Sequence, residues 1–415
     1  MSPGLSRHCW LAALIFLLGA ALRLVPWTAF DGLGYDASWY RKYLLALDRH
    51  GLAVYPEICA AYLEDGRDEQ TIAKVPPMRV LFVVAGWAWK RAAFGDAPPA
   101  DLNVPGGLAA DPAHRSLQRV AGLFGCLGLL AAWGFARRLL GETEALAVLA
   151  LCACSPLLIH LSQHALIDGL LATCALAGLW ALWESLQKEA SAGWLAAFSL
   201  ACALIVLVKE NALFVGLGFA AVLLLAGPCG YGRATPRHWL AAVAGGLLGI
   251  AGIVWSTGGL GPAIDAYRLI VHKAQALEYA HRTGDGPWSR YLIDLMIFTP
   301  ATLCLAIGGS LRAVREDRRA LALLLFVAVT YVAMCNVRYG MNLRYTAIWE
   351  FPLRALAVAQ MVALAARCRR APLALAAIVA VLCAVDLAQY RQFFVLHRLY
   401  ELPTADLLRA VRMLE

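Results

Sequence analysis

Charged residues are scarce in this sequence. Only 15% of its 415 residues are Asp, Glu, Lys or Arg, whereas 61% are hydrophobic. An ordinary soluble domain is about 25% charged. The apolar residues also form blocks of roughly 17 residues or more, which is long enough to cross a bilayer as a helix. The sequence therefore excludes an ordinary soluble protein and predicts an all-α polytopic membrane protein.

A regular cysteine pattern is also missing. The sequence contains 12 Cys residues, and most of them, such as Cys126 and Cys304, lie inside apolar blocks, where Cys behaves as a small hydrophobic residue. Without a CxxC pair, neither a disulfide framework nor a zinc site is expected. His160 and His164 are spaced to share a helix face, but no second ligand motif accompanies them.

Two further absences narrow the possible functions. No Gly-rich phosphate loop occurs in a strand–helix context, which argues against an enzyme that uses nucleotide sugars. No internal repeat of useful length is visible, which weakens the interpretation as an inverted-repeat transporter. The net charge of +8 comes mostly from loops between apolar blocks, where basic residues normally set membrane topology rather than bind nucleic acid.

What the sequence does contain is a series of apolar blocks separated by short charged or Gly/Pro breaks, which are natural helix ends. We expect about 11 transmembrane helices, within a range of 10 to 13. The first is interpreted as an uncleaved span. The predicted spans are 9–26, 117–136, 144–161, 168–184, 193–208, 211–227, 239–256, 292–311, 320–335, 345–366 and 371–388.

Lys and Arg orient these spans. With the N-terminus inside, most basic residues fall in inner loops, as the positive-inside rule requires. Segment 76–95 has an uninterrupted apolar core of only Val80 to Trp89, which suits an interfacial helix better than a span. It therefore stays in a large first outer loop, 27–116. We expect residues 1–388 to form one integral-membrane domain, and 389–415 to be a short outer tail without a separate soluble domain.

Ionisable residues collect at the outer ends of the spans. Asp36 begins an amphipathic, aromatic-rich helix, 37–48, and could cap that helix or act as a general base. Asp168 opens the fourth span, where it could be a partner of the helix dipole or a functional carboxylate. Lys209 and Glu210 could form a buried charge pair or face an anionic headgroup. Ionisable groups at bilayer depth cost about 2.5–3.5 kcal/mol, so they usually face a cavity or a partner.

The order of several stretches resembles a known family. They are "YDASWYRKYL", "AKVPPMRVLF", the long segment from Arg115 to "SQHALIDGLLATCAL", "ALIVLVKENALF", "GDGPWSRYLIDLMIFTP" and "MNLRYTAIWEFPL". In this order they resemble the GT-C glycosyltransferases that use lipid-phosphate sugars, in particular the protein O-mannosyltransferase and aminoarabinose transferase group (family 39-like). Three features depart from the family pattern. Ala37 replaces a second acid, Val75 separates Lys74 from the Pro pair, and no acid-x-acid motif lies near Asp168.

This resemblance implies a GT-C-like fold and an enzyme that moves a sugar from a polyprenyl-phosphate donor to an acceptor hydroxyl of a lipid, glycan or protein, with inversion. It implies no required cofactor, and the missing acid-x-acid motif disfavours a divalent metal. The residues that it singles out are Asp36 and Asp168 for catalysis; Lys74, Lys209, Arg344 and Tyr345 for the donor phosphate; and His164, Glu210, Trp288 and Tyr291 as further pocket candidates.

Two other functions fit the same composition. A transporter or flippase for a lipid-linked substrate would place charges near mid-membrane on broken helices, whereas here the charges gather at one end of the spans. A non-catalytic lipid-binding protein of the same fold is the second alternative. The content of Ala, Leu and Arg suits a bacterial inner membrane, with the candidate site on the periplasmic face and a role in glycosylation of the cell envelope.

Overall fold

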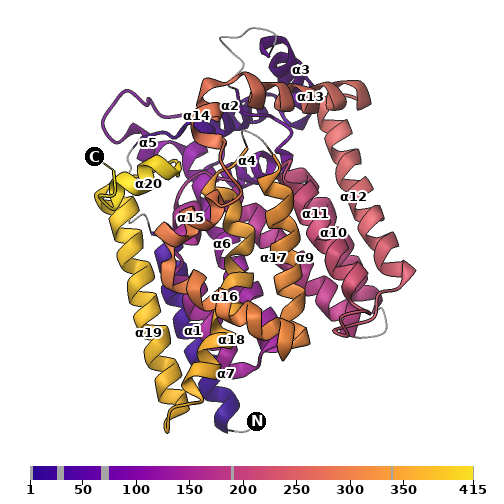
Figure 1. The fold of residues 1–415 in the computed structure, drawn as a ribbon. Helices are drawn as coiled ribbons and strands as arrows, with labels where there is room; N and C mark the ends of the chain where they lie inside the picture. Colours follow the sequence, from indigo (N-terminus) through magenta and orange to yellow (C-terminus); the bar gives the residue numbers. More distant parts are fainter. Residues whose placement is uncertain (1–2, 26–31, 67–73, 188–190, 338–339, 415) are drawn as a thin grey trace.

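The computed structural model describes residues 3–25, 32–66, 74–187, 191–337 and 340–414. Within these ranges the chain is helical and contains no strand (Figure 1). Long helices run side by side as a bundle, and shorter helices cover one end of it, at the top of the view. The N-terminus lies at the opposite end of the bundle from this helical cover.

Every predicted span corresponds to a helix or to a helix pair. Seven helices are long and apolar enough to cross a membrane, and the bent pair α7–α8 would be an eighth. These helices make the chain an integral membrane protein. The bundle helices are α1 (Pro3–Leu24), α6 (Pro112–Leu139), α7 (Glu142–Cys154), α8 (Pro156–Gln163), α9 (Asp168–Gln187), α10 (Ala192–Val208), α11 (Ala212–Leu225), α12 (Pro236–Thr257), α15 (Arg290–Phe298), α16 (Pro300–Arg315), α17 (Arg318–Cys335), α18 (Glu350–Ala365) and α19 (Ala371–Tyr390).

Two predicted spans are broken in the structure. Ser155 ends α7, and its hydroxyl accepts a hydrogen bond from the Leu158 N–H at the start of α8. Pro156 follows, and proline cannot continue the hydrogen-bonding pattern of the preceding helix. The two helices meet at 53°. Thr299 separates α15 from α16, which begins at Pro300, but its side chain does not cap the second helix.

The described part of the loop that was predicted to be the first outer loop is folded onto one end of the bundle. It contains α2 (Tyr35–His50), α3 (Tyr55–Asp65), α4 (Val80–Phe94) and the short α5 (Gly107–Ala110). As predicted, α2 is amphipathic and buries Tyr40, Tyr43, Leu44 and Leu47. The 15 residues of α4 are too few to span a bilayer, in agreement with the prediction for 76–95. Helices α13 (Leu260–Ala276) and α14 (Glu278–Gly284) complete the cover (Figure 1).

The C-terminal tail returns to the same end of the molecule. After α19 the chain forms the π-helical segment η3 (Arg391–Leu396) and then α20 (Thr404–Ala410), which lies near the first outer loop (Figure 1). Leu402 and Leu407 are fully buried. The tail therefore packs on the outer end of the bundle and brings its own side chains close to those of the loops.

Candidate active site

Arg344 links carboxylates from three distant parts of the chain. It lies in the 3₁₀ segment η2 (Leu343–Trp349), and its side chain is only 7% exposed. Its guanidinium nitrogens lie 3.3 Å from Asp36 Oδ2, 3.2 Å from Glu401 Oε2 and 4.0 Å from Asp168 Oδ2. The first loop, the tail and α9 thus meet at one cation.

Asp168 and Lys209 form the most enclosed ion pair of this group. Lys209 Nζ donates to Asp168 Oδ1 at 2.6 Å, and both side chains are 2% exposed. Lys209 ends α10, and its ammonium lies 3.9 Å from the centroid of the Tyr345 ring. Two charges buried this deeply are tolerated only when several partners compensate their lost hydration, and here the ring and Arg344 supply that compensation.

A second buried pair extends the network toward α2. Arg79 donates to both carboxylate oxygens of Glu210, at 2.5 and 3.2 Å, and to the Tyr40 hydroxyl at 2.6 Å. Burial by itself would raise the pKa of Glu210, but Arg79 and Lys209 outweigh burial and hold that pKa below its usual value. Glu210 is therefore ionised and fixes Arg79 beside the helix that carries Asp36. We call the residues joined in this way the ion network: Asp36, Arg79, Asp168, Lys209, Glu210, Arg344 and Glu401.

Lys74 belongs to a neighbouring group of cations. It is ion-paired with Asp65 and lies 5.3 Å from the Trp39 ring, which Lys42 also approaches, at 4.0 Å. Burial and the charge of Lys42 lower the pKa of Lys74. Lys273 of α13 donates to the Lys74 carbonyl oxygen at 2.6 Å, and burial, Lys74 and Arg79 lower its pKa to about 7. We call Lys42, Lys74 and Lys273 the lysine cluster.

The further pocket candidates differ in how close they lie to the ion network. The His164 ring is buried and lies 5.3 Å from the Tyr400 ring and 4.6 Å from the His160 ring. Tyr291 is buried edge-on against Trp349 at the end of η2, with ring centroids 5.4 Å apart. Trp288 is 49% exposed. Among the described residues, neither Tyr291 nor Trp288 shows a hydrogen bond or ring contact with the ion network.

The start of α2 bears on the interpretation of Asp36 as a helix cap. The helix begins at Tyr35 after Gly34, and no side chain caps it. The Asp36 carboxylate instead faces Arg344 and is 18% exposed. Capping is therefore not the role of this residue, and its carboxylate is still accessible from solvent.

The sequence analysis did not single out three residues that belong to the ion network or the lysine cluster: Glu401, Arg79 and Lys273. Arg79 belongs to the stretch that drew attention to Lys74, and a lone Arg directly before an apolar helix was a usable signal. Lys273 was one of several charges on an amphipathic helix. Glu401 had no signal, because its position depends on how the tail folds back.

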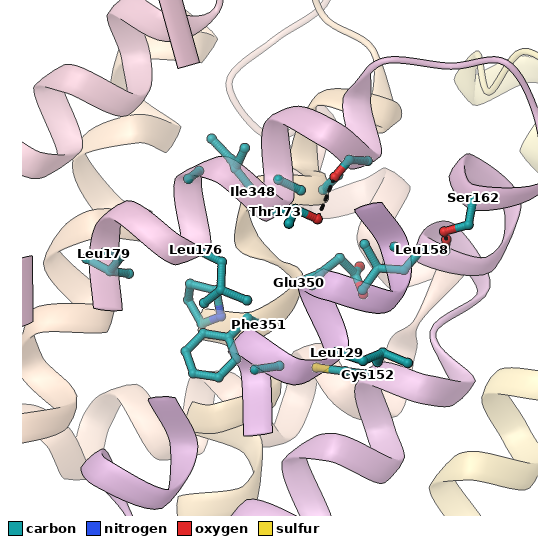
Figure 2. Close-up of a pocket in the computed structure, with 18 of the residues that line it drawn as sticks. Leu129, Cys152, Leu158, Ser162, Thr173, Leu176, Leu179, Ile348, Glu350 and Phe351 are labelled. Atoms are coloured by element: carbon teal, nitrogen blue, oxygen red, sulfur yellow. Dashed lines mark hydrogen bonds between the residues drawn. The ribbon is translucent and has the colours of Figure 1, made fainter. Parts of the chain in front are cut away.

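A further buried charge cluster lies among the spans. Arg354 contacts Glu350 at 3.1 Å and Asp386 at 3.0 Å, and the Ser155 hydroxyl donates to Glu350 at 2.6 Å. Figure 2 shows Glu350 beside Cys152 and Phe351 in a mostly apolar cavity of about 40 Å³. Arg354 bridges the two acids, and these contacts join α18 to α19 and to the break between α7 and α8. Among the described residues, no group of three or more His, Cys, Asp or Glu is placed to hold a metal ion.

Comparison with known proteins identifies the fold. The family model for dolichyl-phosphate-mannose-protein mannosyltransferase matches residues 111–255, a segment that includes Asp168, Lys209 and Glu210. No curated protein matches the chain. ArnT from Cupriavidus metallidurans in the apo state aligns with a TM-score of 0.55 at 15% identity, covering 88% of this chain and 64% of ArnT. The chain has the GT-C glycosyltransferase fold.

Two other structures support this GT-C assignment. ArnT bound to undecaprenyl phosphate aligns with a TM-score of 0.52 at 16% identity, again covering 88% of this chain and 64% of ArnT. The apo oligosaccharyltransferase of Archaeoglobus fulgidus aligns with a TM-score of 0.59 at 14% identity, covering 92% of this chain and 56% of that enzyme. The present chain thus spans less than two thirds of the length of these GT-C structures.

Proposed function

We propose that the protein is a membrane glycosyltransferase that moves a sugar from a polyprenyl-phosphate donor to an acceptor hydroxyl. One observation carries this proposal. Asp36, Asp168, Lys209 and Arg344, which are far apart in the sequence, meet at the end of the bundle that the outer loops cover. They do so on a fold shared with an ArnT structure bound to undecaprenyl phosphate.

The charges divide the site into two parts. The ion network holds three cations and four carboxylates, so it cannot bind an anion without rearranging. The lysine cluster brings three amino groups together, of which Lys74 alone is paired with a described carboxylate, that of Asp65. Lys273, with its pKa lowered to about 7, gains its full charge only when an anion binds beside it. The donor phosphate would bind between the lysine cluster and Arg344, where cations in a partly desolvated site stabilise the phosphate as it leaves.

Asp36 is the residue best placed to act as general base. It is accessible, and the contact with Arg344 orients its carboxylate. In the proposed reaction Asp36 accepts the proton of the acceptor hydroxyl while that oxygen attacks the anomeric carbon. The bond between that carbon and the phosphate oxygen breaks, its electron pair leaves with polyprenyl phosphate, and the configuration inverts. Asp168 is buried against Lys209 and Arg344, so its proposed role is to hold those two cations in position.

We place the enzyme in a bacterial inner membrane with this site on the periplasmic face. The Arg-rich loops at the opposite end of the bundle support that orientation. No metal is assigned a role, because the lysine cluster offers positive charge to the phosphate and no acid-x-acid motif lies near Asp168. EDTA is therefore expected to leave the transfer rate unchanged.

The test supplies purified protein in nanodiscs with radiolabelled polyprenyl-phosphate sugars and an extract of envelope lipids and glycans as acceptors. Asp36→Asn should lower the transfer rate by at least about 100-fold, because a positioned base contributes about 10² to 10⁴. Asp96→Asn is the control, since Asp96 is exposed in the same loop and pairs only with Arg91. Full activity of Asp36→Asn would show that another group is the base. Movement of intact donor across the bilayer without sugar transfer would favour the flippase alternative.

A further inference from the structure

The C-terminal tail brings a tyrosine to the start of helix α2. Tyr400 is 8% exposed, and it directly precedes Glu401, whose carboxylate contacts Arg344. Its ring lies against Gly34, the residue before α2. A Cβ added at Gly34 would lie 1.9 Å from the Cζ atom of that ring and 2.3 Å from its hydroxyl oxygen. Tyr400 therefore occupies the space that a side chain at position 34 would need, two residues before Asp36.

Gly34 is needed at this position for space rather than for backbone freedom. Its φ of −61° and ψ of 153° are values that any residue adopts. A larger residue would therefore keep the local backbone but would push the Tyr400 ring away. The close approach of the tail to α2 is thus a specific contact that one methyl group would disturb.

The Tyr400 hydroxyl lies beside the first turn of α2. The first N–H groups of a helix have no partner within that helix. The Ser38 N–H donates to the Gly34 carbonyl oxygen at 2.9 Å, and the preceding N–H, that of Ala37, points to the Tyr400 oxygen. Burial raises the pKa of Tyr400, and the nearby charge of Asp36 raises it further. The hydroxyl is therefore protonated at neutral pH, next to the turn that carries Asp36.

Two buried histidines at the end of α8 hold Tyr400 from the other side. His160 Nε2 lies 3.1 Å from the Tyr400 carbonyl oxygen and donates a hydrogen bond to it. The His164 ring lies edge-on to the Tyr400 ring, with centroids 5.3 Å apart. His160 also stacks on Phe394 of η3 at 4.1 Å. The backbone and the ring of Tyr400 are thus both fixed from the bundle.

We infer that Tyr400 is a positioning residue for Asp36: its ring and hydroxyl fix the first turn of α2, and His160 fixes Tyr400. The tail is then a working part of the site. This inference rests on the proposed function, because Tyr400 acts through the proposed base. Placement matters, since a displacement of about 1 Å can lower a rate about 10²-fold.

The first test separates turnover from donor binding in nanodiscs. Tyr400→Phe keeps the ring and removes the hydroxyl, so it should lower kcat about tenfold and leave KM for the donor within about twofold. Tyr267→Phe is the matched control, because Tyr267 is 38% exposed on α13, and it should match wild type. An unchanged kcat for Tyr400→Phe would overturn the inference.

A double-mutant cycle distinguishes positioning of the base from general damage to the fold. If Tyr400 acts through Asp36, its hydroxyl is of little use once the base is gone. Tyr400→Phe should therefore slow the Asp36→Asn protein by less than about twofold, although it slows wild type about tenfold. A loss of about tenfold in both backgrounds would show that Tyr400 supports the structure and does not act through Asp36.

Gly34→Ala tests the same contact from the side of α2. The added methyl group should displace the Tyr400 ring and lower kcat more than Tyr400→Phe does, by about 10²-fold. Gly261→Ala is the control, because a Cβ there would meet no atom within 4 Å. Full activity of Gly34→Ala would contradict the close approach of the tail.

Hydrogen exchange gives a readout that does not depend on sugar transfer. Loss of the Tyr400 hydroxyl should speed exchange of the Ala37 amide about three- to tenfold, and mass spectrometry of peptides from the start of α2 measures this in detergent. Faster exchange in Tyr400→Phe, with no sugar transfer by wild type, would keep the contact between the tail and α2 but reject the glycosyltransferase and the positioning role with it. Sugar transfer that Tyr400→Phe leaves unaffected would keep the enzyme and reject the positioning role alone.

Discussion

Arg344 is the residue on which the candidate site depends. Its guanidinium carries a single positive charge but lies beside three carboxylates. Asp168 has a second cation in Lys209, whereas Glu401 pairs only with Arg344 among the described ion pairs. Burial raises the pKa of Glu401, and the charge of Arg344 only partly offsets this. Glu401 is therefore the partner of Arg344 that a donor phosphate would displace most easily.

This arrangement predicts a pH effect on donor binding. Because the pKa of Glu401 is raised in the folded chain, its favourable contribution to stability is complete below about pH 4.5 and is lost as the pH rises through the raised pKa. As the pH falls, protonation of Glu401 releases Arg344. Glu401→Gln should therefore bind polyprenyl phosphate about three- to tenfold more tightly than wild type at pH 7, and the difference should shrink as the pH falls toward 4.5.

The measurement is the ratio of the two dissociation constants at each pH. The ratio is used because the phosphate itself titrates near pH 6 in both proteins. Glu57→Gln, an exposed acid on α3, should match wild type throughout. Weaker binding by Glu401→Gln would mean that the carboxylate helps to hold Arg344 in place rather than competing with the donor.

At this scale the sequence was informative wherever a charge interrupts the outer end of an apolar block. Asp168, Lys209 and Arg344 have that property, Asp36 begins an amphipathic helix beside the first block, and the structure brings the four together. Lys74 was singled out by the same stretch that contains Arg79, but only Arg79 pairs within the ion network. The conformation of the segment before α4 decides between them, and no sequence pattern fixes an irregular segment.

At the scale of helices, apolar blocks located the spans but not their bends. Segments 144–161 and 292–311 were expected to be continuous, and both break at a Pro, at Pro156 and Pro300. Proline is common in membrane helices, where neighbouring groups satisfy the freed backbone, so its presence alone does not predict a break. The bend at Pro156 matters for the site, because it directs α8 and His164 toward the tail.

Close contact between α10 and α12 provides a test of helix packing. A Cβ at Gly245 would lie 2.1 Å from the Ser199 carbonyl oxygen, whereas a Cβ at Gly246 would meet no atom within 4 Å. Backbone atoms cannot move aside as a flexible side chain can. Gly245→Ala should therefore destabilise the protein by about 1–3 kcal/mol, the usual cost of overpacking.

Gly246→Ala is the matched control on the same helix. It should be neutral or slightly stabilising, because Ala favours helix more than Gly does by about 1 kcal/mol. Thermal unfolding in detergent measures both variants. Equal transition temperatures for the two would contradict the close approach of α10 and α12.

For the whole molecule, the main regularity is the difference in charge between its two ends. The ion network and the lysine cluster lie under the covering helices, whereas Arg residues recur in the connections at the opposite end, where some of them pair with Glu, as Arg138 does with Glu184. Lys188, which supports the same orientation, lies outside the described residues. The positive-inside rule places the Arg-rich end in the cytoplasm, so the ion network and the lysine cluster should both face outward.

Two positions at opposite ends test this orientation directly. Cys368 is exposed between α18 and α19, beside Arg367, Arg369 and Arg370. Glu57 is exposed on α3 of the outer loop. In a chain whose other cysteines are replaced by Ala, a membrane-impermeant maleimide should label Glu57→Cys in intact spheroplasts but label Cys368 only after the membrane is permeabilised. The reverse pattern would place Asp36 and Arg344 in the cytoplasm. It would also leave the Arg-rich loops on the side that the positive-inside rule forbids, and the proposed extracytoplasmic transfer would then be wrong.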